Sequence, residues 1–260
     1  MTFGRSLLHI IIIGLSLFNL NIYSEQVPDN IKNVQIVPDN IEVGTFFNGL
    51  QVKVTAEIPY SNDVIVKLVG KEKEMELNKK GKKGIIWLNL SKVKVENAPS
   101  IYILSCTDRL EKICSDEEQE KEMLGYNSLK GRVAFKSDLP LTGIEFDEFI
   151  KLKEHSGYYN IDNKARIKSI SDGKQFLEAT LEIPSFISAD DYNVVIYCFK
   201  DRNLIDKTIV KLSVEEVGLP LLITNLAKGS PAIYGILAIV VAMIAGGIIG
   251  LVFTKKRSNK

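Results

Sequence analysis

The chain has 260 residues, of which 45% are hydrophobic, and its 33 Lys and Arg are balanced by 32 Asp and Glu. This balance leaves no basic field that would hold nucleic acid, and part of the positive charge belongs to the last residues. About 200 residues lie between two apolar terminal segments, which is enough for one large or two small domains with cores of their own.

The amino terminus, residues 1–24, is predicted to be a signal peptide. Arg5 precedes an apolar stretch from Leu7 to Leu20, and a polar boundary follows at Asn21 to Ser24. This layout is typical of a secretory signal and is too short for a convincing membrane span, so we expect cleavage after Ser24. Because Ile22 is an unusual residue three positions before a cleavage site, an uncleaved anchor is the alternative.

Residues 25–107 have the pattern of an exported β lobe. Short β-branched runs are separated by Gly, Pro and Asn turns, and the stretch Val52 to Ile58 alternates apolar with polar residues, as in a strand with one buried face. The predicted strands are Val34–Val37, Leu50–Ile58, Val64–Val69, Ile85–Leu88 and Ile101–Leu104. Several short strands at this spacing favour an antiparallel sandwich.

Residues 108–160 change character and are predicted to be a helical connector. Ser115 precedes an acidic run that is typical of the first turn of a capped helix. A second helix is predicted from Ile144 to His155, where apolar residues recur with helical spacing behind a Thr142 cap.

Residues 161–217 return to a β pattern and form a second predicted lobe, with strands Phe176–Ile183, Tyr192–Phe199 and Leu204–Val214. The short turn at residues 200–203 predicts that the last two strands form a hairpin. The segment before Pro59 resembles the segment before Pro184, a weak sign of duplication. We therefore expect a mainly all-β fold, an antiparallel β-sandwich with Ig-like lobes and a helical connector, and keep one continuous sandwich as the alternative.

A linker at residues 218–231 leads to an apolar run over residues 232–253, long enough to cross a hydrocarbon core of about 30 Å. Lys255, Lys256 and Arg257 follow at once in the tail, residues 254–260. Basic residues stay on the cytoplasmic side, so we expect a single-pass protein of the bacterial inner membrane with its bulk in the periplasm and its carboxy terminus in the cytoplasm.

Small residues recur every four positions in this span, at Ala238, Ala242, Gly246 and Gly250, and therefore share one helix face. Small residues let helix backbones approach closely, which is how spans associate in lipid. The pattern predicts a partner helix, either a second copy of this chain or another membrane protein.

The densest basic run outside the tail contains Lys79, Lys80, Lys82 and Lys83, with two glycines that bend it. Ammonium groups beside free backbone amides suit an anion or a lipid headgroup. A solvated hairpin tip with lysines guarding the apolar strand beside it is the more ordinary interpretation.

Three cysteines lie in the exported region, and Cys106 and Cys114 are a candidate disulfide that would stabilise the fold by about 2.5 kcal/mol. Cys198, in a strand-like run, is interpreted as a buried apolar residue. His155 is isolated, the acidic run lacks the ligand spacing of a calcium loop, and the sequence has no nucleophile elbow. We therefore expect no catalytic residues, no metal site and no cofactor.

The chain resembles an uncharacterised family of transmembrane proteins best known from alphaproteobacteria, with a signal peptide, an exported β-rich region and one carboxy-terminal helix. The segments that carry the resemblance are Lys79-Lys80-Gly81-Lys82-Lys83-Gly84, Ile86-Trp87-Leu88-Asn89, Ala98-Pro99-Ser100, Tyr102, Phe149-Ile150, Leu152-Lys153, Gly157-Tyr158-Tyr159, Leu181-Glu182-Ile183-Pro184, Asp191-Tyr192, Val217-Gly218-Leu219 and Tyr234-Gly235. The Lys-rich composition departs from the Arg-rich members of the family. The resemblance implies no established activity, and it implies a genomic association with permeases of the sulfite or organosulfur exporter type.

These observations predict a non-enzymatic, membrane-anchored accessory or assembly protein whose partners are the bilayer and a membrane protein. The alternative is an envelope redox enzyme or hydrolase that uses Cys106, Cys114 or Cys198.

Overall fold

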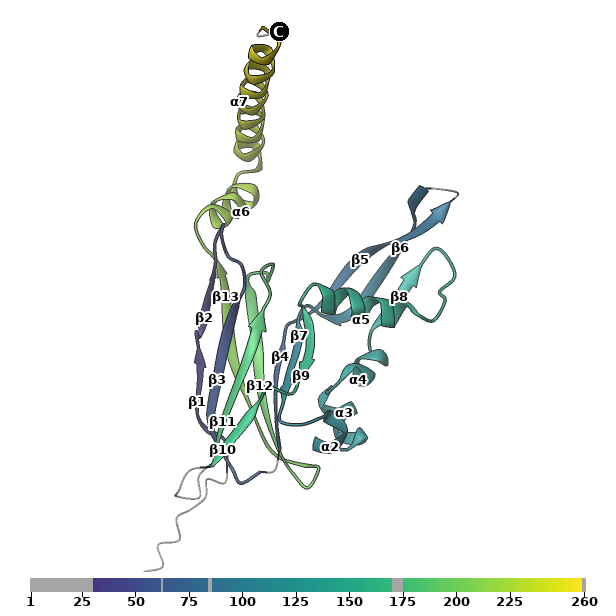
Figure 1. The fold of residues 1–260 in the computed structure, drawn as a ribbon, viewed down its shortest axis with the longest axis vertical. Helices are drawn as coiled ribbons and strands as arrows, with labels where there is room; N and C mark the ends of the chain where they lie inside the picture. The colour runs from purple at the N-terminus through teal and green to yellow at the C-terminus, as the bar shows by residue number, and fades with distance from the viewer. Residues whose placement is uncertain (1–29, 62, 84–85, 170–174, 259–260) are drawn as a thin grey trace, which may run out of the picture.

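A computed structural model describes residues 30–61, 63–83, 86–169 and 175–258 (Figure 1). The predicted signal peptide lies outside the described residues. The described chain is mainly β, in largely antiparallel sheets, and ends in one long apolar helix, which confirms the prediction of a mainly β, antiparallel fold with a carboxy-terminal helix.

Two sheets packed face to face form the body. The first has the order β1-β3-β11-β10, with bounds Lys32–Val37, Leu50–Ile58, Gln175–Ile183 and Arg166–Ser169, and all its pairs are antiparallel. The second has the order β2-β13-β12-β4-β7-β9, with bounds Asn40–Val43, Asn203–Glu216, Asp190–Lys200, Asp63–Val69, Tyr102–Cys106 and Tyr159–Asp162. Its two outer pairs, β2 with β13 and β7 with β9, are parallel.

The main core lies between these sheets and follows from the alternation in the sequence. On β3, Val52, Val54 and Ile58 are fully buried, whereas Lys53 between them is exposed. The central strand β4 is buried at almost every position because its second face is also covered.

The two predicted lobes form one sandwich, which corrects the expectation of separate lobes in favour of the alternative. β3, from the first segment, pairs along its whole length with β11 from the second, and β4 pairs with β12. Backbone pairing between the segments leaves no boundary at which the sandwich divides.

The repeated Ile-Pro segments occupy symmetric places in this sandwich. If Ile58 corresponds to Ile183, then Val54 corresponds to Ala179, and these two residues are direct partners at the centre of the β3–β11 register. Both strand orders are symmetric about this centre, with the two parallel outer pairs at opposite edges of the second sheet. The inner strands of the sandwich are therefore related by this symmetry, whereas the edge strands follow in opposite chain order, with β1 before β2 but β9 before β10.

An additional layer covers the outer face of the second sheet. It consists of a three-stranded sheet, β5-β6-β8, and four helices around a second core. The bounds are Glu72–Lys83, Ile86–Pro99 and Ala134–Ser137 for the strands, and Leu110–Ile113, Asp116–Glu122, Tyr126–Lys130 and Glu145–His155 for helices α2 to α5. The predicted connector is thus a packed layer that also contains a strand.

Local signals place several of these elements. Ser115 accepts a hydrogen bond from the Glu118 backbone N–H at the start of α3, which confirms the predicted cap. Asp201 and Arg202 both have positive φ between β12 and β13, as the tight turn of the predicted hairpin requires.

The chain leaves the sandwich through two helices, α6 at Leu219–Gly229 and α7 at Pro231–Ser258. The predicted linker is therefore mostly helical. Within the described residues, Pro231–Gly250 is the one helix long and apolar enough to cross a bilayer.

Candidate functional site

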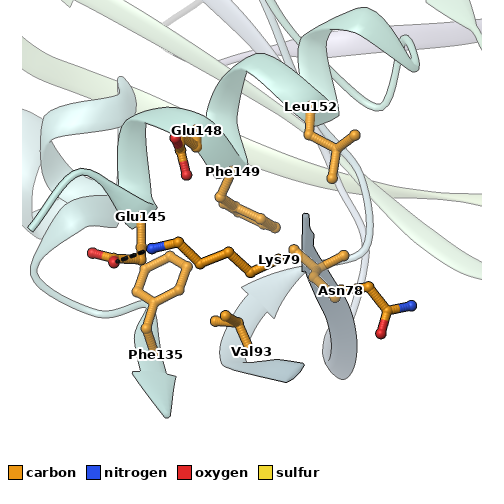
Figure 2. Close-up of a pocket in the computed structure, with 9 residues that line it drawn as sticks. Asn78, Lys79, Val93, Phe135, Glu145, Glu148, Phe149 and Leu152 are labelled. Atoms are coloured by element: carbon orange, nitrogen blue, oxygen red, sulfur yellow. Dashed lines mark hydrogen bonds and ion pairs between the residues drawn. The ribbon is translucent and has the colours of Figure 1, made fainter. Parts of the chain in front are cut away.

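One concave feature of the outer layer is a cleft between α5 and the β5-β6-β8 sheet (Figure 2). Its volume is about 150 Å³, below the roughly 300–1,000 Å³ of small-molecule sites. Its lining is mainly apolar, with one ion pair, and consists of Leu77, Asn78, Lys79, Val93, Phe135, Glu145, Glu148, Phe149 and Leu152. A cleft of this size and character suits single side chains of a protein partner better than a free ligand.

The amphipathic pattern of α5 builds one wall. Phe146, Phe149 and Ile150 face the second core, while Leu152 remains 46% exposed at the rim. Phe135 on β8 meets Phe149 edge to face, with ring centroids 6.0 Å apart. This contact joins the helix to the sheet and fixes the floor of the cleft.

Glu145 holds the beginning of α5. Its carboxylate accepts hydrogen bonds from the Thr142 N–H at 2.6 Å, the Thr142 hydroxyl at 2.8 Å and the Gly143 N–H at 2.7 Å. These bonds, the Thr142 N–H foremost, lower the pKa of Glu145 to about 2. The helix begins after Ile144, so Thr142 assists the first turn through Glu145 rather than as the predicted cap residue.

The predicted lysine cluster lies on β5 of a long hairpin. Lys79 enters the cleft, where its Nζ lies 3.4 Å from Glu145 Oε1, whereas the side chain of Lys80 is exposed. Lys82 and Lys83 belong to the same strand, opposite Trp87 and Ile86. Anion or headgroup contact by this cluster stays a prediction, and Lys79 already has a carboxylate partner.

A second cavity, of about 270 Å³, lies at the other end of α5. Lys153 lines it and lies over the rings of Phe149, Tyr158 and Tyr159, at 5.7, 5.1 and 5.6 Å from their centroids. Burial lowers the pKa of Lys153. Tyr192 lines the same cavity.

Segments that carry the family resemblance, far apart in sequence, meet around this second cavity. The Tyr159 hydroxyl donates to the Pro99 carbonyl at 2.7 Å, and the Tyr102 N–H donates to the Tyr158 carbonyl at 2.9 Å. These contacts join β6 to β9 and β7 to Tyr158, just before β9, so these residues maintain the fold where the outer layer meets the sandwich.

The three cysteines are buried free thiols in the structure. Burial raises the pKa of Cys106 to about 12, of Cys114 to about 11 and of Cys198 to about 12. Cys106 and Cys114 belong to the second core, and Cys198 to the first. The disulfide between Cys106 and Cys114 stays a prediction.

The predicted packing face lies on α7, where Ala238, Ala242, Gly246 and Gly250 are in one helical segment. A Cβ added at Gly246 would meet no atom within 4 Å. The surroundings of Gly246 therefore leave room for a partner helix, and that partnership stays a prediction.

Sequence reasoning found α5 but missed the cleft. Leu77, Val93 and Phe135 come from three strands whose pairing is not visible in any local pattern. Two features of the sequence point to strands at this cleft. Apolar and polar residues alternate after residue 92, and the apolar residue Phe135 precedes the turn that leads into α5.

No curated protein matches this chain, and no solved structure matches it. Residues 33–255 match the model of the family described as "Putative transmembrane protein (Alph_Pro_TM)". This match covers the described sandwich, the outer layer and nearly all of α7, and the chain belongs to this family of transmembrane proteins.

Proposed function

We propose that this protein is a non-enzymatic, single-pass accessory protein of the bacterial inner membrane, with its bulk in the periplasm and its carboxy terminus in the cytoplasm. Its outer layer binds a membrane-protein partner. The observation that carries this proposal is the apolar cleft between α5 and the β5-β6-β8 sheet, with Leu152 exposed at its rim.

The surroundings of the cleft support a protein partner. Leu141 and Ile144 flank the Thr142 and Gly143 amides that bond Glu145 at the cleft, and they are about half exposed, at 46% and 51%. Exposed apolar residues gathered around a concavity mark interaction surfaces, whereas scattered ones do not. A partner that inserts one or two apolar side chains here would bury both the rim and the floor.

The β5–β6 hairpin beside the cleft also supports a protein partner. β8 pairs with β6 only from Val93 to Glu96, so the described outer part of the β5–β6 ribbon has no third strand. Ile86 and Leu88 on this part are 58% and 46% exposed. A two-stranded ribbon is marginally stable alone, and a partner would cover its edge and its apolar face.

The position of the hairpin suits a partner in the membrane. β4 runs in the same direction as β13, because both are antiparallel to β12, and the hairpin leaves the end of β4. The hairpin therefore starts from the end of the sandwich that leads to α6 and α7. It points away from the sandwich in the same general direction as α7 (Figure 1). A permease of the sulfite or organosulfur exporter type, which the family resemblance implies, is the partner we propose.

The burial of the cysteines supports a non-enzymatic role. A redox enzyme needs an accessible thiol with a low pKa, whereas burial raises the pKa of all three thiols.

Site-specific photocrosslinking tests the proposed interface. A photoreactive residue at position 152 in native membranes is expected to give one discrete adduct with another membrane protein. The control is the same residue at Tyr60, which is 56% exposed at the opposite end of the sandwich and is expected to give none. The proposal is wrong if position 152 crosslinks no more than position 60.

A further inference from the structure

Helix α6 has an apolar face that the described protein does not cover. Leu219, Leu222, Ile223 and Leu226 are spaced three and four residues apart and share one side, while Thr224, Asn225 and Lys228 lie elsewhere, together with Leu221, which is 40% exposed. None of the residues of α6 is buried, and Leu222 is 57% exposed. An amphipathic helix normally buries its apolar side, so this helix needs another medium.

The short connection between α6 and α7 keeps α6 next to the membrane. Only Ser230 separates the end of α6 from the start of α7, whose first 20 residues form the candidate span. At its other end the Val217 N–H donates to the Val43 carbonyl at 3.1 Å, which holds α6 against the sandwich. Figure 1 shows α6 between the sandwich and the base of α7.

A second apolar group lies beside the attachment point. A Cβ added at Gly44, the residue after Val43, would meet the Val217 side chain at 3.6 Å, and two residues further on Phe46 is 96% exposed. The loop between β11 and β12 is at the same end of the sandwich, because Ile183 pairs with Leu50, and it exposes Phe186.

We propose that the apolar face of α6, together with Phe46, inserts into the lipid surface next to the span, so that the sandwich rests on the bilayer. Amphipathic helices with apolar residues on one side and a lysine on the other lie in the interface in this way. The contact would fix the height and tilt of the sandwich over the membrane, which a single flexible anchor would leave free.

Tryptophan quenching in the full chain tests this proposal. Trp87, the one tryptophan of the sequence, is first changed to Phe. Leu222→Trp, Phe46→Trp and, as the control, Tyr60→Trp are then made singly in this background. Each protein is reconstituted in vesicles of phosphatidylcholine and phosphatidylglycerol, with or without bromine near the top of the acyl chains.

The tryptophans at positions 222 and 46 are expected to lose about half of their fluorescence or more, because interfacial apolar side chains insert about 5–10 Å into the headgroup and acyl boundary. The tryptophan at position 60 is expected to lose almost none. Equal, weak quenching at all three positions would overturn the proposal. In that case, crosslinks between copies through Leu222→Cys would identify a second copy of the chain as the occupant, and their absence would leave a different protein.

Discussion

At the scale of single residues, the most unusual group is Lys67, a lysine on β4 that is only 3% exposed. Its Nζ donates to the Glu122 carbonyl at 2.6 Å and lies 5.1 Å from the centre of the Tyr197 ring. The lysine thus satisfies a carbonyl at the end of α3 and fastens the outer layer to the sandwich. Desolvation nonetheless lowers its pKa from 10.5 to about 8, against the raising effect of Glu122.

This pKa predicts how stability depends on pH. Between pH 8 and 10.5 the unfolded state keeps the Lys67 proton while the folded state loses it, so the free energy of unfolding rises with pH. We expect the wild type to gain roughly 1–3 kcal/mol over this window relative to Lys67→Met. The measurement is denaturant unfolding of the full chain in detergent micelles, and Lys80→Met, at an exposed position, is the matched control. If the difference in the free energy of unfolding between wild type and Lys67→Met stays the same from pH 8 to pH 10.5, the lowered pKa of Lys67 is contradicted.

The cysteines give a second prediction at this scale. Because all three thiols are buried with raised pKa values, none is expected to react with an alkylating reagent at neutral pH in the folded chain. After denaturation without reductant, the free thiols of the structure predict three modified cysteines, whereas the Cys106–Cys114 bridge proposed from the sequence would leave only Cys198 to react. Mass spectrometry of the alkylated chain counts the modified thiols. Three modified cysteines would show that the bridge does not form, and rapid labelling of the folded chain would reopen the redox alternative.

At the scale of elements, the sequence predicted those whose burial leaves a local pattern. The alternation of β3 and β11 and the capped start of α3 were visible because each has one clear buried face or one clear cap. β2, β8, β9 and β10 were missed, since strands of four residues carry too few positions for a period. The predicted linker covers α6, although the apolar residues of this helix recur with helical spacing.

The long β5–β6 hairpin was also underestimated. It begins with an alternation of Lys and Glu from Lys71 to Glu74, which is typical of solvated loops. In the structure, carboxylates of β5 pair with lysines of β6, as in Glu76 with Lys92 and Glu74 with Lys94, both at 2.6 Å. Cross-strand ion pairs depend on register, and register is not encoded in the spacing along one strand.

The element α7 carries its own prediction. Changing Gly246 and Gly250 to Leu keeps the span apolar and long, so membrane insertion should be unaffected while the close-approach face is filled. Association of the span should weaken by roughly 1 kcal/mol or more, because packing is the main attraction between helices in lipid. Self-association in vesicles, measured by energy transfer between labelled copies, checks this. Leu237→Ile, on another side of the helix, is the control, and equal association of all three proteins would make the small-residue face incidental.

At the scale of the whole molecule, the arrangement of the two halves was out of reach of local patterns. The repeated Ile-Pro segments suggested two copies of a unit, and the expectation of one lobe per copy followed from chain order. The structure pairs β3 with β11 and β4 with β12, so the halves share both sheets. Such pairing joins residues more than a hundred positions apart and depends on the total apolar surface to be buried, not on any single segment.

The cleft could not be predicted from local sequence patterns, because it is formed by segments that are far apart in the chain. It exists only because the hairpin after β4 and the helices after β7 meet on the outer face of one sheet. In the topologically related half, β12 and β13 are joined by a tight turn, and no corresponding layer is inserted there. The outer layer is thus the part of the described chain that departs from this symmetry, and it is where we place the partner.

Co-purification from native membranes tests that placement most directly. Wild-type protein, Leu152→Glu and the control Tyr60→Glu are solubilised in mild detergent, and the membrane proteins that accompany each are compared. The account predicts one partner with wild type and with Tyr60→Glu, and about tenfold less of it with Leu152→Glu, because a hot-spot residue contributes more than about 1 kcal/mol. Equal recovery of the partner with Leu152→Glu, in a protein that is still folded and inserted, would contradict the cleft as the site of partnership.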